Sequence, residues 1–244
     1  MLLALFLIDL AAGLYIFLPL VGRRNAGVKF YRLILIVTGA LAICAALAHW
    51  LARAALTGDA VLVGLTLIVY ALLRYPKRLV LRVPAVLLGI AYIIVAIVTW
   101  RAATGASLAW SIAGAVSSIA LLGTVNLAML LGHWYLVVRG MAIDPLKRLT
   151  IATLIGTMVR IAVVVAALFA PGVWAEVGVR QTIFFWMRAG WGLVGPLALF
   201  PMVWGTVKIR STMAATGILY VDVVAVVIGE VLGGWLAAVA HVPV

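Results

Sequence analysis

The chain has 244 residues, of which 68% are hydrophobic and 10% are charged, and its mean hydropathy is +1.31. A soluble domain carries roughly 45–50% apolar and 25% charged residues, so this composition excludes an ordinary soluble domain. The net charge is +12, but the basic residues lie in short loops between apolar runs, where they set orientation and contact anionic lipid. These loops lack the aromatic interleaving of a nucleic-acid interface, so no nucleic acid is expected as a partner.

The apolar residues come in runs of about 20, the length that an α-helix needs to cross a hydrocarbon core of roughly 30 Å. The runs are continuous and do not alternate with polar residues, which favours helices over barrel strands. The sequence therefore predicts an all-α transmembrane bundle of about eight spans, with residues 1–244 forming a single integral membrane domain. The predicted spans are 2–22, 33–52, 57–73, 83–100, 108–138, 149–171, 181–204 and 213–238. Asp144 and Pro145 predict an N-cap and a first helical turn that lead into the sixth span.

The distribution of lysine and arginine predicts the orientation. The loops after the first, third, fifth and seventh spans hold thirteen basic residues, whereas the alternate loops hold only Arg53, Arg101 and Arg180. By the positive-inside rule, both termini lie on the non-cytoplasmic side of a cell inner membrane. Tryptophans fall near both predicted interfaces: Trp50, Trp100, Trp110, Trp174 and Trp235 at the outer one, and Trp134 and Trp204 at the inner one.

Five ionisable side chains lie inside predicted spans: Asp9, Arg160, Arg188, Asp222 and Glu230. A charge at the centre of a span costs about 2.5–3.5 kcal/mol, so such residues face the bundle interior and find partners. At a rise of 1.5 Å per residue, all but Glu230 fall in one layer between the midplane and the outer third. We expect Asp222 to neutralise both arginines, with Asp9 or Glu230 as a second partner. This network either joins the last three spans or lines a polar cavity for a quinone headgroup, an anion or a proton.

The seventh predicted span is the most irregular. Pro196 removes a backbone hydrogen bond, and the glycines between residues 190 and 195 permit close approach of another helix or a ligand. A kinked helix that carries Arg188 and Trp191 suits the wall of a ligand site. Close helix packing is the alternative interpretation.

A polar and aromatic run, His133-Trp134-Tyr135, lies one to two turns inside the predicted cytoplasmic interface. Imidazole, indole and phenol groups can hydrogen-bond to a quinone and stack on its ring, so these residues are candidates for a quinone or substrate site. The alternative is an interfacial belt, because aromatic residues gather at this depth.

Haem b is a lesser possibility among cofactors. His49 and His133 differ in depth by about 16 Å, which excludes them as the two axial ligands of one haem. His49 and His241 both lie near the outer side and are the remaining haem-ligand candidates. The sequence has no Cys/His set with metal-ligand spacing and no hydrolase nucleophile signature, so no metal site and no hydrolytic chemistry are predicted.

The sequence supports three functional hypotheses, and it assigns no enzymatic activity. The first is the membrane subunit of a respiratory or other redox complex, which interacts with a quinone and with partner subunits that carry the redox centres. The second is a small proton-coupled transporter in which Arg160 or Arg188 binds an anion and Asp222 or Glu230 carries the proton. The third is a passive membrane anchor or assembly subunit whose buried charges are structural.

Overall fold

A computed structural model describes residues 1–73, 78–138, 140–171, 173 and 179–244, with the backbone alone for 78–81 and 179–181. Throughout these residues the regular structure is helical. The helices are α1 (Leu2–Phe17) with a 3₁₀ turn η1 (Leu18–Leu20), α2 (Arg23–Leu51), α3 (Thr57–Leu72), α4 (Arg78–Thr104), α5 (Leu108–Val137), α6 (Asp144–Leu168), α8 (Val179–Ala189), a π-helical segment η2 (Gly190–Val194), α9 (Gly195–Lys208) and α10 (Thr212–Ala240).

Within the described ranges, seven helical stretches are long and apolar enough to cross a membrane. The eighth apolar helix, α3, has 16 residues and is about 24 Å long, which is shorter than a typical hydrocarbon core. The prediction of an all-α chain with multiple apolar helices is confirmed, and the structure supports seven full-length spans with one shorter helix beside them.

Two helix starts differ from the sequence-based expectation. α2 begins at Arg23, ten residues before the predicted span, and Gly27 interrupts its first turns with a φ of 76°. α6 begins at Asp144 with Ile143 as its N-cap and no side-chain capping bond, so the prediction of Asp144 as the N-cap was wrong by one residue. Pro145 does lie in the first turn, where its missing N–H costs nothing.

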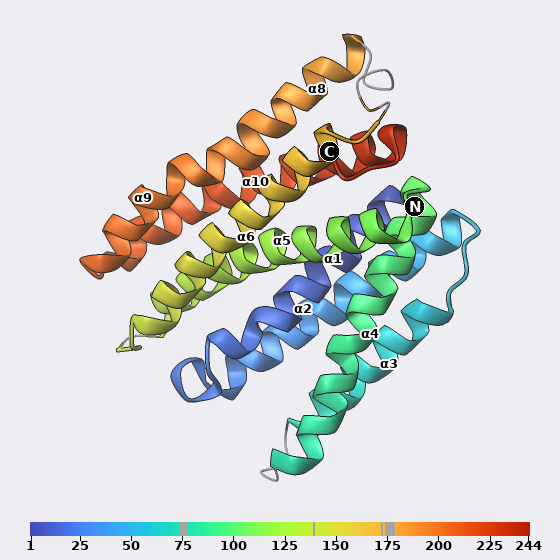
Figure 1. Ribbon diagram of the computed structural model, residues 1–244. Helices are drawn as coiled ribbons and strands as arrows, with labels where there is room; N and C mark the ends of the chain where they lie inside the picture. The colour runs from blue at the N-terminus through green and yellow to red at the C-terminus, as the bar shows by residue number, and fades with distance from the viewer. Residues whose placement is uncertain (74–77, 139, 172, 174–178) are drawn as a thin grey trace.

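The helices form one bundle in which α1 and α5 occupy the centre (Figure 1). α5 packs against α1, α4, α6 and α10, while α2, α3 and α4 lie on one side and α6, α8, α9 and α10 on the other. Both termini lie at one end of the bundle, and the α1–α2, α5–α6 and α9–α10 connections lie at the opposite end (Figure 1).

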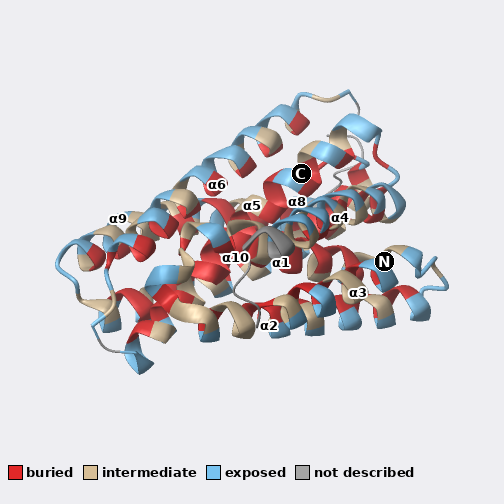
Figure 2. Cartoon of the chain, turned by 90° about the horizontal axis from the view of Figure 1, so that it is seen from below, coloured by how far each residue is buried: buried red, intermediate tan, exposed pale blue. Residues whose placement is uncertain are grey.

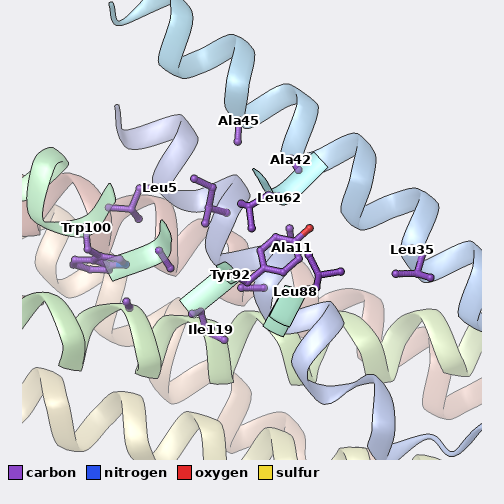
Figure 3. Close-up of a cluster of buried hydrophobic side chains, with 14 of the residues drawn as sticks. Leu5, Ala11, Leu35, Ala42, Ala45, Leu62, Leu88, Tyr92, Trp100 and Ile119 are labelled. Atoms are coloured by element: carbon purple, nitrogen blue, oxygen red, sulfur yellow. The ribbon is translucent and has the colours of Figure 1, made fainter. Parts of the chain in front are cut away.

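Large apolar side chains cover much of the outer surface as well as the interior. Trp50, Leu51 and Phe169 are 64%, 73% and 84% exposed, and exposed faces run along the outer helices (Figure 2). Exposed apolar side chains in this number are what a hydrocarbon environment requires. Inside the bundle, Tyr92 and Trp100 belong to a cluster of apolar side chains contributed mainly by α1 to α5 (Figure 3).

The two central helices touch backbone to backbone. A Cβ added to Gly13 would lie 2.4 Å from the Cα of Gly123, and one added to Gly123 would lie 2.3 Å from the Cα of Gly13. No side chain fits between these atoms, so glycine is required on both helices. Small residues allow membrane helices to pack this closely, where dispersion contacts hold them together.

We predict that Gly123→Leu destabilises the protein by more than the roughly 1–3 kcal/mol of ordinary core overpacking, because α1 and α5 must separate. The free energy of unfolding in detergent measures the effect. Gly64→Leu is the matched control, since no atom lies within 4 Å of a Cβ added at Gly64. Equal stability of the two variants would contradict the close α1–α5 contact.

Candidate functional site: a buried arginine–glutamate network

The centre of the site is Glu230 on α10, whose carboxylate is shared by two arginines from different helices. Arg160 on α6 donates from Nε to Oε1 at 3.0 Å and from Nη2 to Oε2 at 2.9 Å. Arg188 on α8 places Nη2 2.9 Å from Oε1. Both arginines are 0% exposed and Glu230 is 4% exposed. The paired geometry of Arg160 is the bidentate arrangement that makes arginine–carboxylate pairs strong and directional.

Arg160 also connects the network to the central helices. Its Nη1 donates to the Ser117 hydroxyl at 3.0 Å on α5, and its guanidinium lies 5.6 Å from the Trp100 ring centroid. The Trp100 indole in turn donates to Asp9 Oδ2 on α1 at 2.7 Å. Five helices (α1, α4, α5, α6 and α10) therefore meet at Arg160, and α8 joins them through Glu230.

Trp100, which was expected in an aromatic belt at the outer interface, faces the bundle interior and not the lipid. Its side chain is 1% exposed and belongs to the core (Figure 3). Asp9 requires a donor in the bundle interior, and the indole N–H supplies it. Another predicted interface residue, Trp174, lies outside the described residues.

Glycines make room for Arg188. A Cβ on Gly233 would lie 2.6 Å from Arg188 Nε, and one on Gly192 would lie 2.8 Å from Nη1 and 2.5 Å from the Cα of Gly229. The Nε group donates to the Val244 carbonyl at 3.4 Å, while Nη1 has no hydrogen-bond partner within the part of the chain that the structure describes. These contacts favour the packing interpretation of the glycines in the seventh span.

The irregularity predicted around Pro196 takes the form of the π-helical segment Gly190–Val194. A π turn is one of the ways in which a helix accommodates a break in its hydrogen-bond ladder, such as the one that a proline causes. Within this segment Trp191 is 58% exposed, whereas Arg188 is fully buried. The predicted ligand wall made of Arg188 and Trp191 is therefore wrong, because the two side chains face opposite environments.

The prediction that Asp222 neutralises the arginines is also wrong. Asp222 is 2% exposed, its Oδ1 has no hydrogen-bond partner, and it forms no ion pair among the described residues. The predicted sixth span begins at residue 149, whereas α6 as a whole begins at Asp144 and places Arg160 about 24 Å along its helix. Glu230 lies about 27 Å along α10 and Asp222 only about 15 Å, so Glu230 is at the depth of the arginine.

The His133, Trp134 and Tyr135 side chains point in three directions, as consecutive helical residues must. His133 is exposed, with Nδ1 3.3 Å from the Tyr220 hydroxyl. The Trp134 ring packs 5.6 Å from that of Phe30, and the Tyr135 hydroxyl donates to the carbonyl of residue 142. The three groups do not converge on one ligand.

The two haem-ligand candidates, His49 and His241, form hydrogen bonds with two different helices. His49 Nδ1 lies 2.7 Å from Asp59 Oδ2 on α3, and both residues are buried. His241 Nδ1 contacts the Thr104 carbonyl on α4. Haem ligation by His49 and His241 stays a prediction.

Asp59 is a buried partner that the sequence analysis missed. His49 lies in the last turn of α2 and Asp59 in the first turn of α3, so each charge would complement the dipole of its helix. That spacing across a short loop is the signal from which the pair could have been inferred.

A cavity of about 440 Å³ lies beside the network, between the start of α1, Phe184 on α8 and the C-terminal half of α10. Among the described residues that line it, Glu230 alone is charged, and its walls include Phe6, Phe184 and Trp235. Phe184 and Trp235 form an edge-to-face pair with centroids 5.1 Å apart. The cavity thus presents an apolar, aromatic wall and a single carboxylate held by two arginines.

The fold and the site together define a multi-pass membrane protein with a buried, charge-paired centre next to an apolar cavity. Comparison of the chain with protein-family models, with curated proteins and with solved structures finds no match. The function is therefore argued from the site alone.

We predict that Glu230→Gln destabilises the protein by about 3–5 kcal/mol, because two buried guanidinium groups lose their counter-charge. Asp222→Asn, on the same helix, should cost less than about 1 kcal/mol, since that carboxyl forms no ion pair. Unfolding in detergent titrated with SDS compares the two variants. A loss of stability in Asp222→Asn as large as in Glu230→Gln would contradict the assignment of Glu230 as the counter-ion.

Proposed function

We propose that this chain is the membrane subunit of a redox complex and that the cavity beside Glu230 binds the headgroup of a quinone. The observation that carries the proposal is the combination of aromatic walls with one carboxylate in a cavity of about 440 Å³. This volume lies in the range of roughly 300–1,000 Å³ that small-molecule sites occupy. The proposal moves the quinone site from His133-Trp134-Tyr135, whose side chains diverge, to the α1–α8–α10 cavity.

The chemistry of the cavity suits the hydroquinone form in particular, because its hydroxyls are donors and the ion-paired carboxylate is an acceptor. The ring of either form packs against Phe184 and Trp235, and a hydroquinone hydroxyl can donate to Glu230. Because Arg160 and Arg188 fix the carboxylate in place, the ligand is oriented without a rearrangement of the bundle. Reduction of a quinone takes two electrons and two protons, and under this proposal partner subunits carry the redox centres that supply or accept the electrons.

We also propose that the end of the bundle that carries Arg23, Arg24, Arg148, Lys208 and Arg210 faces the cytoplasm, in a cell inner membrane. These residues lie at the end opposite to both termini (Figure 1), so the positive-inside rule places both termini on the non-cytoplasmic side. The cavity and Glu230 then lie in the outer half of the membrane.

A second candidate function is a small proton-coupled transporter. Two observations favour it: the π-helical segment that follows Arg188, and the buried Asp222 with an unpaired oxygen. Interrupted helices and isolated intramembrane carboxyls are features of transport sites. In this alternative, Arg188, whose Nη1 has no hydrogen-bond partner among the described residues, binds the anion and Asp222 carries the proton.

We predict that a photoreactive azido-quinone labels the protein within residues 230–235 or at Phe184. Gly234→Phe should reduce this labelling at least tenfold, because Gly234 lines the cavity and the new ring fills it. Trp191→Phe is the matched control, since Trp191 is largely exposed and is not among the residues that line the cavity. Mass spectrometry of the labelled peptides gives the positions.

Labelling that is spread over the surface, or that Gly234→Phe leaves unchanged, would contradict the quinone site. Proton-coupled anion uptake by proteoliposomes, abolished in Asp222→Asn, would then favour the transporter. A chain that shows neither property, but that co-purifies with other subunits, would be the passive anchor.

We predict that a membrane-impermeant maleimide labels Ala55→Cys but not Ile209→Cys in intact cells. Both substitutions are made in the Cys44→Ser protein, so that the introduced thiol is the one that reacts. Both positions are exposed, and they lie at opposite ends of the bundle. Labelling of both after permeabilisation is the control for reactivity. The reverse pattern in intact cells would overturn the proposed orientation.

A further inference from the structure

A second cavity, of about 420 Å³, lies at the end of the bundle opposite to the termini, between the end of α1 with η1, and α2, α3 and α4. Its polar groups are already satisfied within the protein. The Tyr15 hydroxyl donates to the Ala85 carbonyl at 2.9 Å, and the Tyr31 hydroxyl donates to the Leu18 carbonyl at 3.2 Å. The walls therefore offer apolar surface to a ligand and few hydrogen bonds, which suits a hydrocarbon chain and not a polar solute.

The cavity reaches the surface that faces hydrocarbon. Val86 and Ile90, which line it, are 61% and 49% exposed, and they follow one another on the same face of α4. An acyl chain can therefore enter from the side, in the plane of the bilayer. The cavity is thus a groove in the lipid-facing surface, the α1–α4 groove.

Positive charge lies at one end of the α1–α4 groove. Arg23 Nη2 donates to the carbonyl of Leu73, a residue that lines the groove, at 3.2 Å. On α4, Arg82 is exposed and precedes Val86 by four residues, so it lies on the face of the helix that Val86 shares with the groove. Arginines from α2 and α4 thus approach the end of the groove from two sides.

No acidic residue compensates this charge in the neighbouring sequence. Between Asp9 and Asp59, and again between Asp59 and Asp144, the chain contains no Asp or Glu, whereas Arg24, Lys29 and Arg32 add to the charge of Arg23. Neither Arg23 nor Arg82 forms an ion pair among the described residues. An apolar groove that ends at such arginines is complementary to a molecule with a hydrocarbon chain and an anionic head. Arginine forms paired hydrogen bonds with phosphate, which makes it a good partner for a phospholipid headgroup.

We propose that the α1–α4 groove is a binding site for an anionic phospholipid. One acyl chain lies in the groove, and Arg23 and Arg82 bind the phosphate. The short helix α3 and the lipid then fill this side of the bundle together. The site is separate from the Glu230 cavity, so the inference does not depend on quinone binding.

The test uses native mass spectrometry of the full chain in detergent with added phosphatidylglycerol or phosphatidylcholine. The wild-type protein should retain phosphatidylglycerol at least fivefold more than phosphatidylcholine. Arg82→Gln should reduce this preference, because it removes a headgroup contact without touching a backbone acceptor. Gly89→Leu should reduce retention of both lipids, because Gly89 lines the groove and a leucine side chain there fills it. The backbone tolerates the change, since a Cβ at Gly89 would lie at an ordinary contact distance of 3.8 Å from Tyr15 Cε1.

Two control variants are matched to these changes. Arg101→Gln removes an exposed arginine at the opposite end of α4, and Gly64→Leu adds the same side chain where the surroundings are open. Both should bind lipid as the wild type does. Equal retention of the two lipids by the wild type, or unchanged retention in Gly89→Leu, would overturn the proposal. Thermal unfolding without added lipid verifies that each variant is folded.

Discussion

Two arginines and one glutamate, removed from both water and lipid, determine how the bundle is assembled. Each charge alone would be costly within a membrane, and together they are acceptable because Glu230 accepts from Arg160 through two aligned hydrogen bonds and lies against Arg188. The three residues come from α6, α8 and α10. The pairing therefore fixes the relative depth of these helices, which apolar packing alone would leave free to slide.

Glycine contacts make this pairing geometrically possible. Gly192 and Gly229 bring η2 and α10 into backbone contact, and Gly233 leaves space for the Arg188 side chain. On the other side of the centre, the Gly13–Gly123 contact holds α1 against α5, where Asp9 accepts from Trp100 and Ser117 accepts from Arg160. Glycine therefore occupies the positions where two helices must approach closely for the charged side chains to reach one another.

The bundle contains two apolar cavities of different character. The cavity beside Glu230 combines aromatic walls with a fixed carboxylate, whereas the α1–α4 groove has apolar walls and arginines at one end. The first suits a ligand with a hydrogen-bonding ring, and the second suits a chain with an anionic head. Both lie next to α1, at opposite ends of the bundle (Figure 1).

The sequence by itself determined the class of fold, because the length and continuity of apolar runs depend only on local composition. It also identified Arg160, Arg188 and Glu230 as buried charges. Which carboxylate meets which arginine was decided by the tertiary structure, since a five-residue difference in the start of α6 changes depth by about 7.5 Å and exchanges Asp222 for Glu230. Trp100 and Asp59 gained their roles in the same way, because their partners lie on other helices whose faces and depths no local pattern specifies.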